Sequence, residues 1–277
     1  GVEVMSMVPI GASIKDGFEA GHGLPFDSDG MKERYPGIFF SQFTGAELMA
    51  EKWNLSREDL DKFALSSHQK AAAAVEGKYF DREILPIQAK NAEGKTDMVL
   101  NDEGIRYDAS LEALSGLNPV TEGGVITAGN ASQITDGAAA LMICNDEGLK
   151  KVKADPRARI VGISVVGDDP IMMLGGPIPA SHKVLKATNL NINDIDLYEV
   201  NEAFAPVPLS WAIELKADMS KLNVNGGAMA LGHPLGATGA KLMTTLLHEL
   251  ERTNGRYGLQ AICEGGGTAN ATIIERI

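Results

Sequence analysis

From Ala158 onward, segments with strand patterns alternate with segments that have helix patterns, and this alternation restricts the fold more than any other feature. The predicted strands cover residues 159–166, 195–199, 259–263 and 271–275, and the predicted helices cover residues 180–188, 206–216 and 239–250. Trp211 and Leu215 are expected on the buried side of the second helix. The order strand, helix, strand, helix, helix, strand, strand predicts an α/β fold with a mixed sheet.

Residues 1–133 differ in sequence pattern: most of this stretch is predicted to form loops, and one clear helix is predicted. Ser56 is the expected N-cap of that helix, and Asp59 stands three residues later, as in a capping box. Apolar residues then recur until Gly77, and a short strand is predicted over residues 84–87. We therefore expect the end of one core strand followed by a loop or cap domain over residues 1–133.

A bridge over residues 134–154 is expected to belong to the first half of the fold, and residues 155–277 to form the second half. The apolar run over residues 139–144 is typical of a strand buried on both faces, so Cys144 is expected in the core. A charged helix is predicted from residue 146 to about residue 154. The chain opens on what resembles the end of a strand, so we expect the first half to be incomplete.

Composition and charge exclude several classes of protein. A formal net charge of −12 without a basic stripe argues against nucleic-acid binding. No apolar run approaches the length of about 18 residues that a membrane span needs, and no signal-peptide pattern opens the chain. Two cysteines in unlike contexts fit a reducing compartment, and the five histidines lack the paired spacing of metal ligands. We expect a cytoplasmic protein that binds no metal, membrane or nucleic acid.

Three glycine-flanked polar segments carry the candidate chemistry. Asn201 follows a predicted strand, His233 lies among five glycines between residues 226 and 239, and Cys263 precedes three glycines. Glycine lets the main chain approach a ligand closely and point its own N–H groups at a developing oxyanion. An amide, an imidazole and a thiol at such turns are the groups that acyl transfer through thioesters requires.

Each of these residues also has an interpretation without catalysis. His233 can cap a helix or bond a carbonyl, Cys263 can be a buried structural cysteine, and Asn201 can be a turn former or an N-cap. The five glycines around His233 favour a functional role for this residue. Each glycine costs conformational entropy on folding, so packing alone does not explain so many of them. The apolar residues 39–43 and 172–174, with Met229, indicate either a roomy acyl pocket or core packing.

Taken together, these segments resemble the thiolase family of acyl-CoA acyltransferases. The resemblance rests on Asn201-Glu202-Ala203-Phe204, Gly232-His233-Pro234, Cys263-Glu264-Gly265-Gly266-Gly267 and the segments over residues 124–132, 136–139 and 176–180. These motifs occur in the family's order along nearly the whole chain. The resemblance implies two pseudo-symmetric, layered α-β-α halves with mixed sheets, and a loop (cap) domain inserted in the first half.

The resemblance also implies roles for individual residues. His233 would activate a nucleophilic cysteine and contact an oxyanion, Cys263 would serve as acid and base, and Asn201 would hold an oxyanion water. The main-chain N–H of Gly265 would belong to a second oxyanion hole. The residues expected along the CoA and substrate path are Ala128, Ser132, Ala203, Phe204, Arg106 near the adenine end, and Met173. CoA would be a co-substrate, and no covalently bound cofactor is expected.

The reaction implied is cleavage of a 3-ketoacyl-CoA by CoA, or the reverse condensation, through an acyl-enzyme. Family members carry the acyl-accepting cysteine upstream of the segment that is here Gly1 to Ser6, so this chain alone is expected to be inactive. That segment could be a separate chain, and a homodimer or homotetramer is expected. Two alternatives stay open: a catalytically incomplete subunit that binds CoA esters, and a ketoacyl synthase, which usually has a second histidine where this chain has Cys263.

Overall fold

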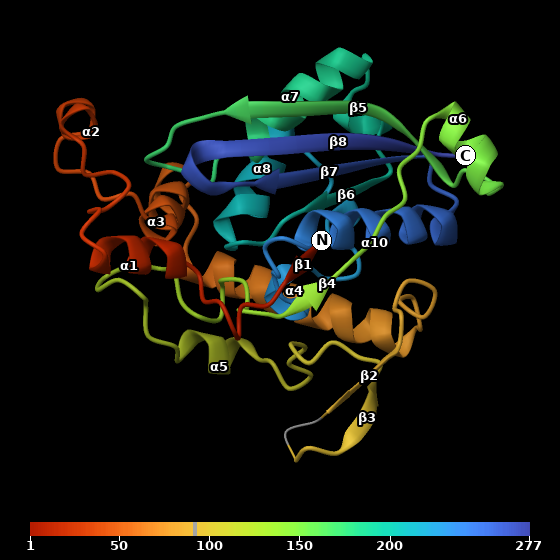
Figure 1. Cartoon of the computed structure of the whole chain (residues 1–277), viewed down its shortest axis with the longest axis horizontal. Coiled ribbons are helices and arrows are strands. Elements are labelled where there is room, and N and C mark those ends of the chain that lie inside the picture. Colours follow the sequence, from red (N-terminus) through yellow and green to blue (C-terminus); the bar gives the residue numbers. More distant parts are fainter. Residues whose placement is uncertain (91–92) are drawn as a thin grey trace.

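The computed structural model describes residues 1–90 and 93–277, and its largest sheet has the strand order β5-β8-β7-β6 (Figure 1). These strands are β5 (Ala158–Gly167), β6 (Leu197–Val200), β7 (Tyr257–Cys263) and β8 (Thr268–Arg276). Strand β8 is antiparallel to both of its neighbours, whereas β6 and β7 are parallel. The mixed sheet that the alternating pattern predicted is therefore confirmed.

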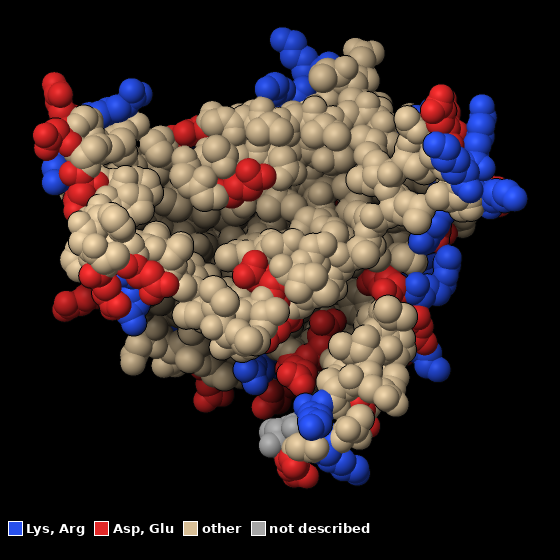
Figure 2. Space-filling view, in the orientation of Figure 1, with Lys and Arg blue, Asp and Glu red and all other residues tan. Residues whose placement is uncertain are grey.

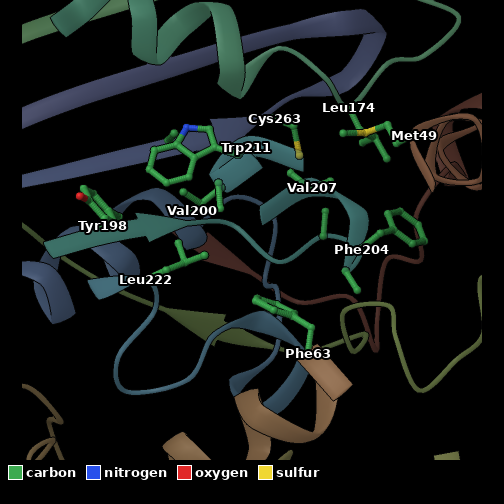
Figure 3. Packing of buried hydrophobic residues seen from close by; sticks show 14 of the residues in the cluster. Met49, Phe63, Leu174, Tyr198, Val200, Phe204, Val207, Trp211, Leu222 and Cys263 are labelled. Atoms are coloured by element: carbon green, nitrogen blue, oxygen red, sulfur yellow. The ribbon is translucent and has the colours of Figure 1, made fainter. Parts of the chain in front are cut away.

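Helices cover both faces of this sheet (Figure 1). Helix α7 (Pro177–Thr188) packs on β5, β7 and β8 and carries α8 (Pro206–Leu215) beside it, while α10 (Thr238–Thr253) packs on β6 and β7. Trp211 of α8 is fully buried, and its Nε1 donates to Ser181 Oγ at 2.8 Å. Figure 3 shows the core cluster in which Trp211 packs. Both α7 and α10 pack on β7, which explains why this strand is apolar almost throughout, whereas Ile163 and Val165 of the outer strand β5 are exposed.

The predicted helix in the first part of the chain is confirmed as α4 (Arg57–Glu76). The Ser56 and Asp59 side chains form the expected capping box with each other's main-chain N–H groups. Four shorter helices that sequence analysis did not predict also form: α1 (Ala12–Glu19), α2 (Asp29–Arg34), α3 (Gln42–Lys52) and α5 (Leu111–Ser115). Serine caps start three of them, but helices of two or three turns give little periodicity to detect.

A hairpin of β2 (Ile87–Lys90) and β3 (Thr96–Val99) extends away from the body of the molecule (Figure 1). The strand predicted over residues 84–87 thus begins only at Ile87. Pro86 stands directly before it, and proline has no N–H to donate to a strand ladder.

The buried strand predicted over residues 139–144 is wrong. Only β4 (Gly137–Ala138) forms, paired with the two residues of β1 (Val2–Glu3), and α6 (Asp146–Val152) follows soon after. Met142 and Ile143 are 76% and 73% exposed, and Cys144 is exposed rather than in the core. An extended segment is buried only where partner strands and a covering layer exist, and here the ladder ends after two residues.

The remaining short elements are α9 (Ala228–Leu231) and three 3₁₀ turns, η1 (Ile192–Asp194), η2 (Met219–Lys221) and η3 (Gly265–Gly267). Of these, α9 and η3 lie beside the segments that sequence analysis singled out.

In Figure 2, Lys and Arg side chains lie around the rim of the face shown. No helix in the described ranges has both the length and the apolar character needed to cross a membrane.

Candidate active site

A cavity of about 420 Å³ lies where β6 and β7 end and the turn before α10 begins. Its wall includes His233, Cys263, Gly265, Ala203, Met173, Leu174, Leu235 and Ile262. Because β6 and β7 are parallel, their carboxyl ends meet at one edge of the sheet, and the Asn201 main-chain N–H donates to the Ala261 carbonyl at 3.0 Å. The fold thus brings residues some 60 positions apart to the same edge.

A second cavity, of about 540 Å³, lies between α3 and the start of α4. Its polar wall includes Glu47, Glu51 and Asp59, and its lining residues carry no imidazole or thiol. Its larger volume therefore does not make it the better candidate for acyl-transfer chemistry.

The imidazole of His233 is held from both of its nitrogens. Nε2 lies 3.2 Å from Asn201 Nδ2, and Nδ1 lies 2.7 Å from Thr238 Oγ1. The Thr238 hydroxyl donates its single proton to the Pro234 carbonyl at 2.9 Å, so it accepts from Nδ1–H of the imidazole. Nε2 is then unprotonated and accepts from the Asn201 amide. This tautomer keeps Nε2 unprotonated, and a thiol that donates its proton to Nε2 takes the place of the Asn201 amide there.

Burial keeps the His233 imidazole neutral. Burial is the larger cause, and the nearby Lys241 ammonium the smaller, of a fall in the His233 pKa from 6.5 to about 4. Both favour the uncharged ring, because a buried cation next to another cation loses solvation and is repelled. Near neutral pH His233 can therefore accept a proton but holds none on Nε2.

Asn201 directly follows β6 and is almost completely buried. Its Nδ2 faces His233, and its Oδ1 has no hydrogen-bond partner within the described part of the chain. A buried amide oxygen without a partner is costly unless a water or ligand donates to it. Asn201 is thus suited to hold a polar group beside the imidazole, which a turn former or N-cap would not need.

Cys263 is the last residue of β7, and its side chain lies in the core cluster of Figure 3. Burial first, and the neighbouring Glu264 carboxylate in smaller measure, raise its pKa to about 12. The thiol is therefore protonated near neutral pH and is suited to donate a proton rather than to attack as a thiolate. The same surroundings would suit a structural cysteine, but Cys263 also lines the cavity with His233.

The glycines after Cys263 shape the cavity wall. Gly266 and Gly267 have φ of 72° and 82°, a region that residues with a Cβ rarely adopt. They turn the chain sharply between β7 and β8, which leaves Gly265 exposed on the cavity wall. Whether the Gly265 N–H stabilises an oxyanion stays a prediction.

The residues expected along the CoA path fall into two groups. Ala203 and Met173 line the cavity, and Ser132 is adjacent because its N–H donates to the Ala203 carbonyl at 2.9 Å. Phe204 is buried and packs edge-on against Phe43, with ring centroids 5.4 Å apart. The other group is Ala128 and Arg106. Both residues are exposed at the surface, and neither lines the cavity.

Glu202 has a structural place that its position after Asn201 did not reveal. Its buried carboxylate accepts from Ser67 Oγ at 2.7 Å, Asn223 Nδ2 at 2.9 Å and the Met229 N–H at 3.1 Å. It therefore ties α4 to the segment that leads into α9, instead of reaching the cavity. Gly227 lies so close to the Glu202 carboxylate that a Cβ on residue 227 would be 2.3 Å from Glu202 Cδ.

Sequence reasoning missed two further residues near His233, namely Thr238 and Lys241. A hydroxyl five residues after a histidine at a helix start was the available signal for Thr238. Lys241 gave no signal, since a lysine in a helical pattern is ordinarily solvated. Among the residues that the structure describes, no three His, Cys, Asp or Glu side chains gather as a metal site would require.

Comparison with known families gives two matches that together span almost the whole chain. Residues 1–147 match the family description "Thiolase, N-terminal domain", and residues 154–276 match "Thiolase, C-terminal domain". The first match ends inside α6, and the second begins shortly after this helix.

Individual relatives agree with these matches. The chain is 51% identical over 278 residues to the steroid 3-ketoacyl-CoA thiolase FadA6 of Mycobacterium tuberculosis, covering 100% of this chain and 67% of that protein. It is 47% identical over 231 residues to the mitochondrial 3-ketoacyl-CoA thiolase of Bos taurus, covering 83% of this chain and 58% of that protein. The chain thus spans roughly three fifths to two thirds of the length of these relatives.

Solved structures show the same similarity. The acetyl-CoA acetyltransferase of Bacillus anthracis has a TM-score of 0.83 at 42% identity, with 87% of this chain and 61% of that chain covered. Human mitochondrial 3-ketoacyl-CoA thiolase in complex with CoA has a TM-score of 0.78 at 44% identity, with 84% and 58% covered.

Proposed function

Because this chain belongs to the thiolase family, we propose that the complete protein is an acyltransferase that cleaves a 3-ketoacyl-CoA with CoA, or runs the reverse Claisen condensation. One observation carries the proposal: Asn201 contacts His233, and His233 and Cys263 line a single cavity. A neutral base, a protonated thiol and a buried amide are the groups that this reaction needs.

The thiol that accepts the acyl group is, in this proposal, neither of the two cysteines of this chain. The pKa of Cys263 is about 12, so the attacking thiolate would be scarce there near neutral pH. Cys144 is exposed and lies outside the cavity wall. The resemblance to the family assigns the nucleophile to a segment that precedes residue 1, either in the same chain or as a separate one.

The proposed cleavage proceeds in two transfers. His233 Nε2 accepts the proton of the nucleophilic thiol, whose sulfur attacks the ketone carbon of the substrate. The bond between C2 and C3 breaks, its electron pair stays on C2, and Cys263 Sγ–H protonates the enolate that departs as an acyl-CoA. The Cys263 thiolate left by that step takes the proton of the CoA thiol, whose sulfur attacks the acyl-enzyme thioester. The bond between the acyl carbon and the enzyme sulfur breaks, the shortened acyl-CoA leaves, and His233 returns its proton to the enzyme thiolate.

Negative charge develops twice on oxygen in this sequence, and the proposal places donors for each site. A water bound to Asn201 Oδ1, together with the His233 imidazole, would stabilise the charge on one oxygen. The Gly265 N–H would donate to the other. The unpartnered state of Asn201 Oδ1 supports the first of these assignments. Loss of one such donor typically costs on the order of 10²–10³ in rate.

The acyl group is expected to be apolar and CoA to extend toward the surface. Met173, Leu174, Leu235 and Ile262 give the cavity an apolar wall, which favours an alkyl chain or ring system over a charged acyl group. Ser132, Ala128, Phe204 and Arg106 stay the candidates for the pantetheine and adenine contacts, with CoA as co-substrate. Kinetics on acyl-CoA substrates of increasing size would measure the preferred length.

A second candidate function is a catalytically incomplete subunit that binds CoA esters. The surroundings of the two cysteines favour this alternative, because neither one is a suitable nucleophile. Both functions predict that this chain alone binds CoA without turnover, which calorimetry would measure. An acyl adduct formed when the rest of the protein is present would favour the acyltransferase, and binding of CoA esters without any adduct there would favour the second candidate. Size-exclusion chromatography with light scattering would test the expected homodimer or homotetramer.

The decisive experiment compares three variants in the complete protein, with CoA and a 3-ketoacyl-CoA as substrates. We expect His233→Ala and Cys263→Ala each to reduce kcat by about 10³-fold or more, while circular dichroism and the melting temperature show a retained fold. Cys144→Ala is the matched control and should keep wild-type turnover. Wild-type rates in both site variants would end the assignment.

A further inference from the structure

The position of Lys241 at a helix start and its burial both disfavour a charged lysine side chain. Lys241 belongs to the first turn of α10, where the partial positive charge of the helix N-terminus repels a cation. It is also partly buried, and this burial lowers the pKa of its ammonium group. Two unfavourable effects at one position indicate that the ammonium makes contacts that offset them.

Those contacts are main-chain carbonyls at the end of α9. Lys241 Nζ donates to the Leu231 carbonyl at 3.2 Å and to the Gly232 carbonyl at 3.4 Å. The C-terminal carbonyls of a helix carry partial negative charge and lack intrahelical partners, so a cation is favoured there. Among the described residues, no carboxylate forms an ion pair with Nζ, and the Leu231 and Gly232 carbonyls are its hydrogen-bond partners.

The two carbonyls belong to the turn that presents His233. Gly232 has φ of 79°, and its N–H donates back to the Ala228 carbonyl at 3.0 Å. On the other side of the Gly232–His233 peptide, the His233 N–H donates to the Gln133 carbonyl at 3.3 Å. The peptide that leads into the imidazole is therefore held from its carbonyl by Lys241 and from its N–H by Gln133.

Several acidic groups surround the ammonium at longer range. Asp102, Glu199, Glu202 and Glu83 favour its charged form, and they come from β6, from the loop after β6, and from two loops of the first part of the chain. Glu199 is completely buried and has one carboxylate oxygen without a partner in the described ranges. His233 is the neutral group on which the same ammonium acts in the opposite sense.

We propose that Lys241 is a positioning residue for His233: its ammonium fixes the Leu231–Gly232 turn so that imidazole Nε2 faces the cavity. The charge of the ammonium also lowers the pKa of the imidazole. This inference rests on the proposed role of His233 as the base. Lys241 itself touches no reacting atom and acts only through the turn and through its field. The role differs from that of Thr238, which sets the tautomer.

The test uses three substitutions that separate hydrogen bonding from charge. Lys241→Arg keeps both, Lys241→Gln keeps an N–H donor without charge, and Lys241→Met keeps only the apolar stem. Each variant is prepared with ¹³C-labelled histidine, and the signal of His233, one of five histidines, is assigned by its loss in His233→Gln. Its pKa is then titrated by NMR, and kcat and KM are measured on the complete protein.

We expect the pKa of His233 to rise above about 4 in Lys241→Met and Lys241→Gln but to stay below 6.5, because burial, the larger cause of its lowering, remains, and to stay near 4 in Lys241→Arg. We expect kcat to fall by about 10²-fold in Lys241→Met with an unchanged KM for CoA, and less in Lys241→Gln. An unaltered His233 titration together with wild-type kcat in Lys241→Met would overturn the proposal. If even the wild-type protein lacks turnover, the proposed function fails, while the titration still decides the role of Lys241.

Discussion

Replacing Thr238 by valine should impair the proposed base without disturbing the packing around it. Thr238 is 2% exposed, and valine has nearly its shape, so the substitution opens no cavity. The Pro234 carbonyl keeps the N–H groups of Ala237 and Thr238 as donors, each at 2.9 Å. The loss therefore falls on His233 Nδ1–H, whose partner at 2.7 Å disappears.

The size of the effect follows from the unpaired imidazole N–H. Leaving a buried donor without a partner costs about 1–3 kcal/mol, and every 1.4 kcal/mol corresponds to about a factor of ten. The ring can avoid that cost by moving its proton to Nε2 or by turning, and either change removes the lone pair from the cavity. We therefore expect kcat of Thr238→Val to fall by about 10–10²-fold in the thiolysis assay on the complete protein.

The control is Thr238→Ser, which keeps the hydroxyl and should retain most of the activity. Urea unfolding of both variants checks that stability changes by no more than about 1–3 kcal/mol. If Thr238→Val turns over within twofold of the wild type, or if the serine variant is impaired as strongly as the valine variant, the tautomer argument is wrong.

Two further predictions concern the titrating groups of the chain. Iodoacetamide at mildly alkaline pH should label Cys144 quickly and Cys263 only after unfolding, because Cys144 is exposed and the buried Cys263 thiol has a pKa of about 12; intact-mass spectra with equal labelling of both would contradict this. For His233, the unfolded chain binds the proton near pH 6.5 and the folded chain only near pH 4. The contribution of His233 to the free energy of unfolding is therefore fully present above pH 6.5. It decreases by up to about 3 kcal/mol as the pH falls from 6.5 to 4. Urea titrations should show this difference between wild type and His233→Gln, and parallel curves would refute it.

The elements that sequence analysis predicted correctly are those whose signals are local. The capping box at Ser56 defines the start of α4 within four residues, and the spacing of Trp211 and Leu215 defines the buried side of α8. The three polar segments were also recognisable locally, from the residue types of Asn201, His233 and Cys263 and from the neighbouring glycines, and their catalytic roles stay predictions. The structure brings these segments to the same edge of the sheet, as the parallel pairing of β6 and β7 requires.

What sequence analysis could not predict depends on partners far along the chain. The run over residues 139–144 is as apolar as a core strand, yet its exposure is decided by how long β1 pairs with β4. The importance of Thr238 and Lys241 likewise depends on where the Gly232 turn places the imidazole and the carbonyls of α9. Such contacts are set by turn geometry, for which the sequence offers glycines but no coordinates.

The two groups that we propose as acid and base reach the same uncharged state by opposite pKa shifts. Burial lowers the pKa of His233 and raises that of Cys263, so near neutral pH the base is uncharged and the acid is uncharged. A cavity that holds a neutral base and a neutral acid carries no charge to solvate before the substrate arrives. Charge would arise there only during the reaction, on oxygens that face Asn201 and the glycine turn, and fixed donors are most effective for charge that develops in such a place. In this proposal, Lys241 contributes by keeping His233 neutral in the resting state, although it never touches the substrate.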